Sequence, residues 1–287
     1  MKIAFIVNPI SGTHTKNSII RLIHDMFKEP QYEVVIKKTR WAGHAITLAN
    51  DLGKVYDVVV AVGGDGTLNE VAQGLLNTSA KFGIVPMGSG NGLARHLQIP
   101  INAKKALNRI KQNSPHLIDV LFFNDIPFMN VSGIGFDAKV AYNFAESEKR
   151  GLLSYLKQIV RLYFRFLPVE TEFVVNNRTF KRAIWLIAIA NSSQFGNNAV
   201  ISPISDVSDG VFEVIILKPF PLWAVPAVVI RMFTKSMHRC KYIEIIQTQN
   251  VSIVTSKPIE SHVDGTPYKM DTIFNVRIQQ GALKVLI

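Results

Sequence analysis

The sequence predicts two domains: an N-terminal α/β domain with a parallel sheet, and a β-rich C-terminal domain built as an antiparallel sandwich. Two observations carry this prediction. Up to about residue 118, short apolar runs alternate with stretches whose apolar residues recur every three or four positions, the pattern of strands alternating with amphipathic helices. Beyond residue 118, strand-like runs follow one another with turn residues between them. We therefore expect one domain at residues 1–118 and another at 119–282.

In the first domain, predicted strands alternate with predicted helices. The strands are expected at residues 3–7, 33–37, 58–62 and 82–85, and the helices at 18–27, 44–52, 68–76 and 103–111. Such alternation implies parallel strands, whose carboxyl ends meet at one edge of the sheet, where α/β proteins bind ligands. The loops after these strands carry glycines and polar residues, at 8–12, 39–44, 63–67 and 86–92. The sequence therefore predicts a nucleotide cleft at this edge.

The loop at residues 63–67 has the composition of a phosphate site. A buried-strand pattern, VVVAV, ends at Gly63, and Gly64 and Gly66 flank Asp65 before a helical pattern begins. Glycine lets phosphate oxygens approach backbone N–H groups, and the N-terminal end of a helix attracts anions. A carboxylate beside phosphates requires a cation between them, so Asp65 indicates Mg²⁺-nucleotide chemistry. The alternative is a glycine-rich turn whose aspartate only caps the helix.

The second domain is predicted as a succession of strands interrupted by two helical inserts. Strands are expected at 119–123, 127–131, 170–175, 183–190, 211–217, 242–246 and 251–255, with turns at 176–177 and 208–210. The inserts, at about 149–167 and 222–238, are rich in basic and aromatic residues, and Lys157, Arg161 and Arg165 form a stripe on the first. Such helices suit the face of an anionic bilayer. The alternative is a pair of helices that pack on the sandwich and present a solvated basic side.

The composition is that of a folded protein with excess positive charge. Of 287 residues, 48% are hydrophobic, and 32 basic against 21 acidic residues give a net charge of +11. This charge either favours phosphorylated ligands and anionic lipid surfaces or serves solubility alone; nucleic acid is not expected, because no nucleic-acid-binding module is recognisable. The single cysteine, Cys240, indicates a reducing compartment, and the apolar runs are too short to span a membrane. We expect a soluble, cytoplasmic protein that associates peripherally with membranes.

Two other nucleotide motifs do not apply. The chain contains no G-x-x-x-x-G-K-[ST], which excludes a Walker-type NTPase. Residues 133–138 fit a dinucleotide-binding G-x-G-x-x-A pattern but lie outside a βαβ unit, so we predict a turn of the second domain there, near Asn130. The seven histidines show no paired metal spacing, so zinc is not expected.

Taken together, the motifs resemble the diacylglycerol kinase catalytic-domain family, which includes bacterial lipid kinases and sphingosine kinases. The motifs that carry the resemblance follow in the family's order over most of the chain: Asn8-Pro9 with Ser11-Gly12, Gly43-His44-Ala45, GGDGTLNE at 63–70, residues 86–91 and residues 206–214. The resemblance implies a phosphofructokinase-like nucleotide-binding domain, a lipid-binding second domain, and a final strand at 283–287 that returns to the first domain.

The same resemblance implies the site residues. Those expected to bind the nucleotide are Asn8, Pro9, Ser11, Gly12, Thr39, Gly63, Gly64, Asp65, Gly66, Thr67, Asn69, Glu70, Gly88, Ser89 and Asn91. A structural Mg²⁺ would be held by the Asp209 carboxylate and the backbone carbonyls of Asp206 and Val211, with waters completing the octahedron. Asp65 would act through catalytic Mg²⁺ or as the base, and Asp119 matches an acidic position that supports the cleft. The implied cofactors are ATP and Mg²⁺.

Two positions depart from the family pattern. Many members carry Asp-Gly-Glu, with the glutamate as the base for the lipid hydroxyl, where this chain has Asp264-Gly265-Thr266. Thr266 cannot accept a proton at neutral pH, so the base is Asp65 or Asp264, or the match is shifted by a few residues, or the kinase is weak or inactive. Gly92 stands where many bacterial diacylglycerol kinases have Asp, which brings residues 88–91 closer to the sphingosine-kinase branch.

We expect an ATP- and Mg²⁺-dependent lipid kinase that phosphorylates a hydroxyl of a diacylglycerol- or sphingosine-like lipid at a membrane surface. The lipid tails would lie in an apolar groove of the second domain, because removing apolar area from water is favourable. The alternatives are a soluble-substrate kinase resembling NAD kinase and a catalytically weak, nucleotide-binding, membrane-associated protein, which Thr266 favours. The acceptor lipid, the preferred nucleotide and the oligomeric state stay open, with a homodimer as one alternative.

Overall fold

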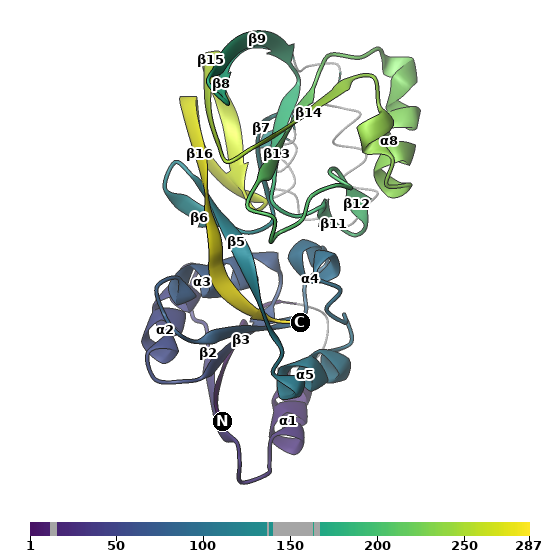
Figure 1. Cartoon of the computed structure of the whole chain (residues 1–287). Coiled ribbons are helices and arrows are strands. Elements are labelled where there is room, and N and C mark those ends of the chain that lie inside the picture. The colour runs from purple at the N-terminus through teal and green to yellow at the C-terminus, as the bar shows by residue number, and fades with distance from the viewer. Residues whose placement is uncertain (12–15, 137, 140–162, 164–166) are drawn as a thin grey trace. The chain divides into compact units, whose positions relative to one another are not determined.

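The chain forms two compact units in a computed structural model that describes residues 1–11, 16–136, 138–139, 163 and 167–287 (Figure 1). Unit 1 comprises Met1–Asp119 together with Gln280–Ile287, and unit 2 comprises Val120–Gln279. Residues near both ends of the chain therefore belong to unit 1.

Unit 1 is a parallel sheet flanked by helices. Its strands are β1 (Lys2–Val7), β2 (Glu33–Lys38), β3 (Val58–Gly63) and β4 (Lys81–Pro86), and its helices are α1 (Lys16–Met26), α2 (His44–Gly53), α3 (Asp65–Leu75), α4 (Gly92–His96) and α5 (Ala103–Gln112). The strands pair in the order β4-β3-β1-β2, all parallel. The end of the long strand β16 (Thr266–Leu286) extends the sheet, since Val285 pairs with Phe82 in parallel.

The core of unit 1 follows from its apolar strands. Every residue of β3 is buried, and Phe5 of β1 and Phe82 of β4 are fully buried. Helices α2 and α3 lie together on one side of the strands, and α1 and α5 lie together on the other (Figure 1). The predicted α/β domain with a parallel sheet is confirmed.

Two helix predictions in unit 1 need correction. Helix α3 begins at Asp65 instead of residue 68, because Gly64 in an extended conformation already ends the strand and its carbonyl accepts from the Leu68 amide at 3.0 Å. Asp65 therefore lies in the first helical turn and not in a free loop. Helix α4 has only five residues, too few for a periodic pattern, and the sequence did not predict it.

Unit 2 is β-rich and antiparallel, as predicted. Its elements, in chain order, are β5 (Pro115–Phe123), β6 (Ile126–Phe128), β7 (Val131–Gly135), β8 (Val169–Val175), β9 (Arg178–Ile184), β10 (Leu186–Ala190), β11 (Gln194–Gly196), β12 (Ala199–Val200), β13 (Phe212–Leu217), η1 (Leu222–Ala224), α8 (Val225–Phe233), η2 (Met237–Arg239), β14 (Ile243–Thr248), β15 (Asn250–Val263) and β16. The main sheet runs β14-β13-β10-β7-β15-β16, and β8 pairs with both β15 and β9. Its interior has two apolar clusters. One is centred on Phe173, Phe212 and Phe274, and the other lies beneath α8.

Three strand-level predictions in unit 2 are wrong. The first half of the expected turn at 133–138, residues 133–135, instead belongs to strand β7. Gly135 ends this strand with φ +96°, and an added Cβ there would lie 2.6 Å from the Trp185 carbonyl oxygen. The strand expected at 127–131 is divided between β6 and β7, and that expected at 183–190 is divided at Trp185 between β9 and β10. Continuous apolar runs conceal these bends. The predicted turn at 176–177 is confirmed, since Asn176 and Asn177 both have positive φ between β8 and β9.

Of the two predicted helical inserts, the second is seen as η1, α8 and η2. The first, with Lys157, Arg161 and Arg165, lies almost wholly outside the described residues. Within the part of the chain that is described, no helix combines the length and hydropathy needed to cross a bilayer.

Candidate active site

The site in unit 1 is built around the turn from β3 into α3. An added Cβ on Gly63 would lie 2.6 Å from Cβ of Thr67, so the chain can pass there only as glycine. Gly66, in contrast, is exposed and its φ is not positive. Apart from its own helical turn, no heavy atom of the described residues lies within 4 Å of such a Cβ. Neither packing nor backbone conformation therefore requires glycine at 66. The open space over Gly66 lies at the N-terminal end of α3, where the helix dipole and amide groups favour an anion.

Asp65 connects this turn to the loop after β4. Its Oδ2 accepts from the Asn91 amide and its Oδ1 from the Gly92 amide, both at 2.8 Å. These two amides open helix α4, so Asp65 acts as its cap. Burial raises the pKa of Asp65, while the two amide hydrogen bonds and the charge of Arg95 act in the opposite direction. Two carboxylate oxygens together offer about four acceptor positions, so the group can accept more than these two amide hydrogen bonds.

The loop after β4 packs directly against the first glycine turn. An added Cβ on Gly88 would lie 2.7 Å from Cα of Gly64, so the two backbones touch. The Met87 amide donates to the Gly63 carbonyl at 2.7 Å. The Asn91 side chain closes the loop, since its Oδ1 accepts from the Gly88 amide at 2.9 Å and its Nδ2 donates to the Gly88 carbonyl at 2.8 Å. Ser89 is left exposed at the tip.

The loops after β1 and β2 lie beside this turn because of the strand order. Asn8 follows β1 and its Nδ2 donates to Oγ1 of Thr67 at 2.9 Å, while Ser11 donates to the Asn8 carbonyl at 3.1 Å. Thr39 follows β2 and its amide donates to the Val7 carbonyl at 3.0 Å. Pro9 is exposed. The structure thus brings together the predicted nucleotide residues of four loops; Gly12 lies outside the described residues.

The two remaining predicted residues, Asn69 and Glu70, lie on α3. The Glu70 carboxylate accepts from the amides of Gly43 and Ala45, at 2.9 and 3.2 Å, and so caps α2. Asn69 accepts a hydrogen bond from the Gln73 side chain one turn later. One helix therefore fixes the N-terminal ends of two others: α4 through Asp65 and α2 through Glu70.

Trp41, in the loop after β2, was missed by the sequence analysis, although its stacking partner His44 belongs to the Gly43-His44-Ala45 motif. Trp41 stacks on His44 with ring centroids 4.1 Å apart, and Trp41 is 62% exposed. His44 is held in turn by the Arg40 amide, which donates to its Nδ1 at 3.1 Å. An exposed aromatic loop residue is recognised only once the strand order is known.

In unit 2, Asp264 forms the tip of the β15–β16 hairpin. Asp264 and Gly265 have φ +46° and +79°, the left-handed pair of a two-residue hairpin turn. The Asp264 carboxylate accepts from the amides of Met129 and Asn130, at 3.1 and 3.0 Å. Thr266 follows at the start of β16 and is exposed. Asp264 therefore has a positioning contact like that of Asp65: a carboxylate fixed by two consecutive backbone amides.

The predicted Mg²⁺ residues of unit 2 lie in an exposed turn before β13. Oδ1 of Asp206 accepts from the amide and hydroxyl of Ser208, and Oδ1 of Asp209 accepts from the Val211 amide at 3.0 Å. Behind them, Glu213 is buried, and its pKa is raised by burial and also by the charge of Asp209. Among the described residues, no three His, Cys, Asp or Glu side chains cluster as a metal site. The predicted set, one carboxylate with carbonyls and water, is not of that clustered type and stays a prediction.

Asp119, the predicted support of the cleft, is buried at the end of unit 1. Its Oδ1 accepts from the Gly281 amide at 2.7 Å. This bond ties residues 280–287 to the body of unit 1.

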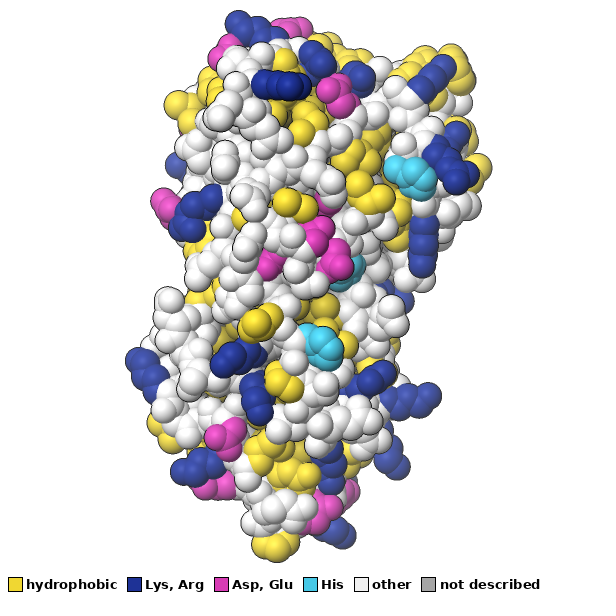
Figure 2. Space-filling model, viewed as in Figure 1, with side chains coloured by type: hydrophobic (Ala, Val, Ile, Leu, Met, Phe, Trp, Pro, Cys, Tyr) yellow, Lys and Arg dark blue, Asp and Glu magenta, His cyan; other side chains and the backbone are white. Residues whose placement is uncertain are grey.

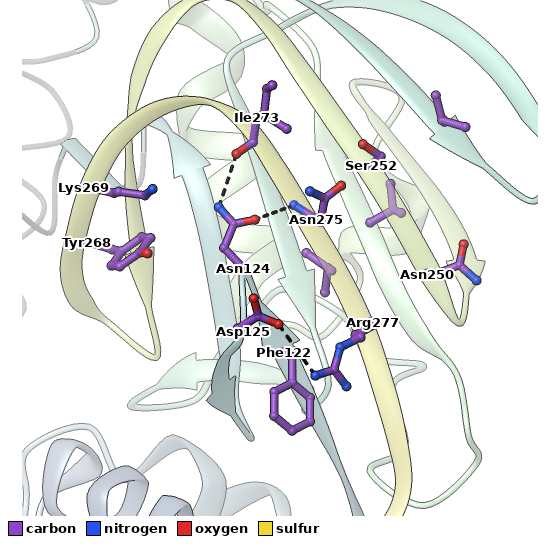
Figure 3. A pocket seen from close by; sticks show the side chains of 13 residues that line it. Phe122, Asn124, Asp125, Asn250, Ser252, Tyr268, Lys269, Ile273, Asn275 and Arg277 are labelled. Atoms are coloured by element: carbon purple, nitrogen blue, oxygen red, sulfur yellow. Dashed lines mark hydrogen bonds and ion pairs between the residues drawn. The ribbon is translucent and has the colours of Figure 1, made fainter.

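The apolar lipid groove expected in the second domain stays a prediction. The depression shown in Figure 3 has a volume of about 750 Å³ and lies along β5, β15 and β16. Aromatic Phe122 and Tyr268 share its lining with Asn124, Lys269 and Arg277. The lining of this depression thus mixes aromatic, polar and charged side chains.

Two family models match this chain, one over most of unit 1 and the other over most of unit 2. The model of the diacylglycerol kinase catalytic domain matches residues 2–123, and that of the YegS C-terminal NAD kinase beta sandwich-like domain matches residues 130–287. The diacylglycerol kinase of Bacillus subtilis (strain 168) is 28% identical over 91% of this chain and 88% of that protein. The diacylglycerol kinase of Staphylococcus carnosus (strain TM300) is 25% identical over 74% of this chain and 71% of that protein.

A crystal structure of a diacylglycerol kinase from Bacillus anthracis str. Sterne shares the fold, with a TM-score of 0.75, 19% identity, and coverage of 99% of this chain and 96% of that chain. The two domain models together cover nearly the whole sequence and agree with the α/β unit and the antiparallel unit that the structure shows. The chain therefore belongs to the diacylglycerol kinase catalytic-domain family and is a lipid kinase.

Proposed function

We propose that this kinase transfers the γ-phosphoryl group of ATP, with Mg²⁺, to a hydroxyl group of a diacylglycerol- or sphingosine-like lipid. The observation that carries the proposal is the open space over Gly66 at the start of α3, beside two loops whose backbones touch. Family membership supports ATP as the donor, and the names of the relatives support a diacylglycerol-like acceptor. In the reaction, the hydroxyl oxygen forms a bond to phosphorus, the bond to ADP breaks, and the hydroxyl proton passes to a base or to water.

The residues of unit 1 fit a nucleotide triphosphate. The N-terminal end of α3 would hold the phosphates through the backbone of Gly66 and Thr67, with Ser89 at the tip of the second loop. Asn8 would keep Thr67 oriented through their 2.9 Å hydrogen bond. Since the sheet order is β3-β1-β2, a nucleotide lying across the strand ends would extend from the glycine turn towards the Trp41–His44 pair.

The Asp65 carboxylate fits a Mg²⁺ ion. A carboxylate can accept more hydrogen bonds or a cation beyond its two helix-capping amides, and a neighbouring cation would offset the cost of burying its charge. Bound Mg²⁺ neutralises charge on the transferred phosphoryl group. Asp209, with the carbonyls of Asp206 and Val211, would hold the second, structural ion.

Asp264 or Asp65 would accept the hydroxyl proton, because Thr266 cannot. General-base assistance contributes about 10²–10⁴-fold, so a reaction that depends mainly on positioning tolerates a weak base. We further propose a cytoplasmic enzyme that meets its lipid at a membrane surface and has no nucleic-acid partner.

The test is transfer of labelled γ-phosphate from Mg-ATP to a panel of diacylglycerols, sphingosine and monoacylglycerol in mixed micelles, and, in a parallel reaction, to NAD in solution. The matched variant is Gly66→Ala, because its methyl group enters the proposed phosphate space and, outside its own helical turn, meets no atom of the described residues within 4 Å. We expect the wild type to label one lipid class and Gly66→Ala to transfer at least tenfold less label. The variant should nevertheless be at least as resistant to unfolding as the wild type. Alanine is favoured over glycine in a helix by up to about 1 kcal/mol.

Label in NAD and in no lipid would instead support a soluble-substrate kinase, which the NAD kinase-like description of the second domain model favours. ATP binding with no labelled product at all would support the catalytically weak alternative and point to Thr266 as its cause. If Gly66→Ala bound ATP as tightly as the wild type, the phosphates would not lie at the start of α3.

A further inference from the structure

The segment from η1 to η2 presents an apolar face to solvent. Trp223 is 73% exposed, Ile230 59% and Phe233 40%, and together with Pro226 and Ala227 they recur at helical spacing along η1 and α8. Of the nine residues of α8, all of them described, Val228 alone is buried. A helix normally buries its most apolar stripe, so the exposed side of α8 is unusual for a protein surface.

Positive charge surrounds this face. Between residues 218 and 243 the sequence has five Lys or Arg residues and no Asp or Glu. Lys235, Arg239 and Lys241 are exposed, and His238 lies among them. Figure 2 shows hydrophobic side chains over α8 next to Lys, Arg and His side chains. The first acidic residue beyond the segment, Glu244, is already paired with Arg182 and Lys218.

Aromatic and basic side chains meet at one end of the face. The Lys241 ammonium lies 5.7 Å from the Trp223 ring centroid and 5.0 Å from that of Tyr242. Tryptophan with a neighbouring lysine is typical of the boundary between lipid headgroups and acyl chains. Helix α8 itself, with nine residues, is far shorter than a membrane span.

From these observations we infer that the η1–α8–η2 face binds an anionic lipid bilayer, with α8 parallel to the membrane plane. Trp223, Ile230 and Phe233 enter the headgroup boundary, and Lys235, Arg239 and Lys241 contact acidic headgroups. A protein partner with an acidic rim would use the same charges, but the nine-residue length of α8 and the tryptophan at the edge of the face favour a planar lipid surface. The inference builds on the proposed lipid kinase, whose acceptor resides in a bilayer, but it concerns docking and not phosphoryl transfer.

The test is flotation of the full chain with vesicles, without ATP. One set contains phosphatidylcholine alone and the other contains about one third phosphatidylglycerol. The variants are Ile230→Asp and Trp223→Ser, and the control is Val55→Asp, an apolar-to-acidic change in unit 1 at a position of the same exposure, 61%. We expect binding to the anionic vesicles, a loss of at least tenfold in both variants, and no change in the control. Replacing Lys241 by Gln should cost about fivefold, and raised salt should weaken binding.

Two further readouts make the test independent of catalysis. Brominated lipids should quench the fluorescence of Trp223. The measurement uses a Trp41→Phe background, which removes the other exposed tryptophan and leaves Trp185, which is only 6% exposed. The rate of phosphoryl transfer to a short-chain diacylglycerol below its critical micellar concentration should be the same for Ile230→Asp and the wild type. Because this acceptor is not in a membrane, the measurement separates docking from the kinase reaction.

Equal flotation of Ile230→Asp and Val55→Asp would overturn the inference, as would equal binding to neutral and anionic vesicles. A wild-type dimer in solution that Ile230→Asp dissociates, with no vesicle binding, would also overturn it and show that a second copy of the chain covers the face. Absence of kinase activity with intact, Ile230-dependent flotation would leave the docking face standing and refute only the proposed reaction.

Discussion

Replacing Asp65 separates its role as a helix cap from a role in metal binding. In Asp65→Ala, the amides of Asn91 and Gly92 lose their acceptor, and Asn91 is 2% exposed, so water replaces it poorly. Loss of a cap costs about 0.5–2 kcal/mol, and a buried donor without a partner about 1–3 kcal/mol. We therefore expect Asp65→Ala to lower the free energy of unfolding by about 2–4 kcal/mol.

Asp65→Asn keeps one acceptor oxygen, but its side-chain NH2 group, a donor, faces the second of the two backbone amides. Burial already disfavours the charge of Asp65, which offsets part of what its hydrogen bonds contribute. The expected loss in the free energy of unfolding is therefore nearer to about 1 kcal/mol. The assay is urea unfolding, followed by a Mg²⁺ titration of lipid phosphorylation at a temperature where every variant is folded.

The control is Glu70→Gln, because Glu70 also caps a helix with two backbone amides and belongs to the same helix α3. If Asp65 engages Mg²⁺, Asp65→Asn should raise the Mg²⁺ concentration for half-maximal activity at least tenfold while Glu70→Gln leaves it unchanged. Equal Mg²⁺ responses from the two variants, with similar losses of stability, would refute the metal role and leave Asp65 as a cap.

Three other changes test separate parts of the structure. Gly88→Ala places a Cβ 2.7 Å from Cα of Gly64, so we expect a loss of about 1–3 kcal/mol in urea unfolding and weaker ATP binding by calorimetry, whereas unchanged stability would contradict the backbone contact. Despite partial burial, the hydrogen bond and charge of Arg182 hold the pKa of Glu244 below its usual range. Glu244→Gln should therefore cost about 0.5–1 kcal/mol at pH 7, and the deficit should vanish as the pH falls below about 4; a deficit independent of pH would exclude the ion pair as its cause. Asp209→Asn should abolish the rise in melting temperature that millimolar Mg²⁺ gives the wild type, and an undiminished rise would place that ion elsewhere.

The elements that carry strong periodicity could be predicted from the sequence, and the short or bent ones could not. The apolar run of β3 and the turns at Asn176-Asn177 are local signals, and they fold as their residues dictate. Helix α4 escapes prediction because its five residues hold together through Asp65, a residue 26 positions before Asn91. The break at Trp185 likewise depends on packing between strands and not on the local pattern.

The candidate site shows the same division. Glycine and polar residues after strands correctly indicated which loops converge, because parallel strands share one edge. The sequence could not separate glycines that packing requires, such as Gly63, from Gly66, where space is left open, since that difference depends on Thr67 and on the loop after β4. Nor could it show that the carboxylates of Asp65 and Glu70 are already engaged by backbone amides.

The division of unit 1 between both ends of the sequence affects how the protein is made. Strand β4 already pairs with β3, but it acquires its second neighbour only when Val285 arrives. The hydrogen bond from the Gly281 amide to Asp119 likewise forms only once Gly281 has been synthesised. On the ribosome, unit 1 is therefore incomplete until all of unit 2 has been synthesised, although domains generally fold in order of their emergence. During that interval β4 presents an unpaired edge, which is a template for aberrant pairing. A nascent chain stalled at residue 279 should accordingly remain protease-sensitive in unit 1 and become resistant only after residues 280–287 emerge.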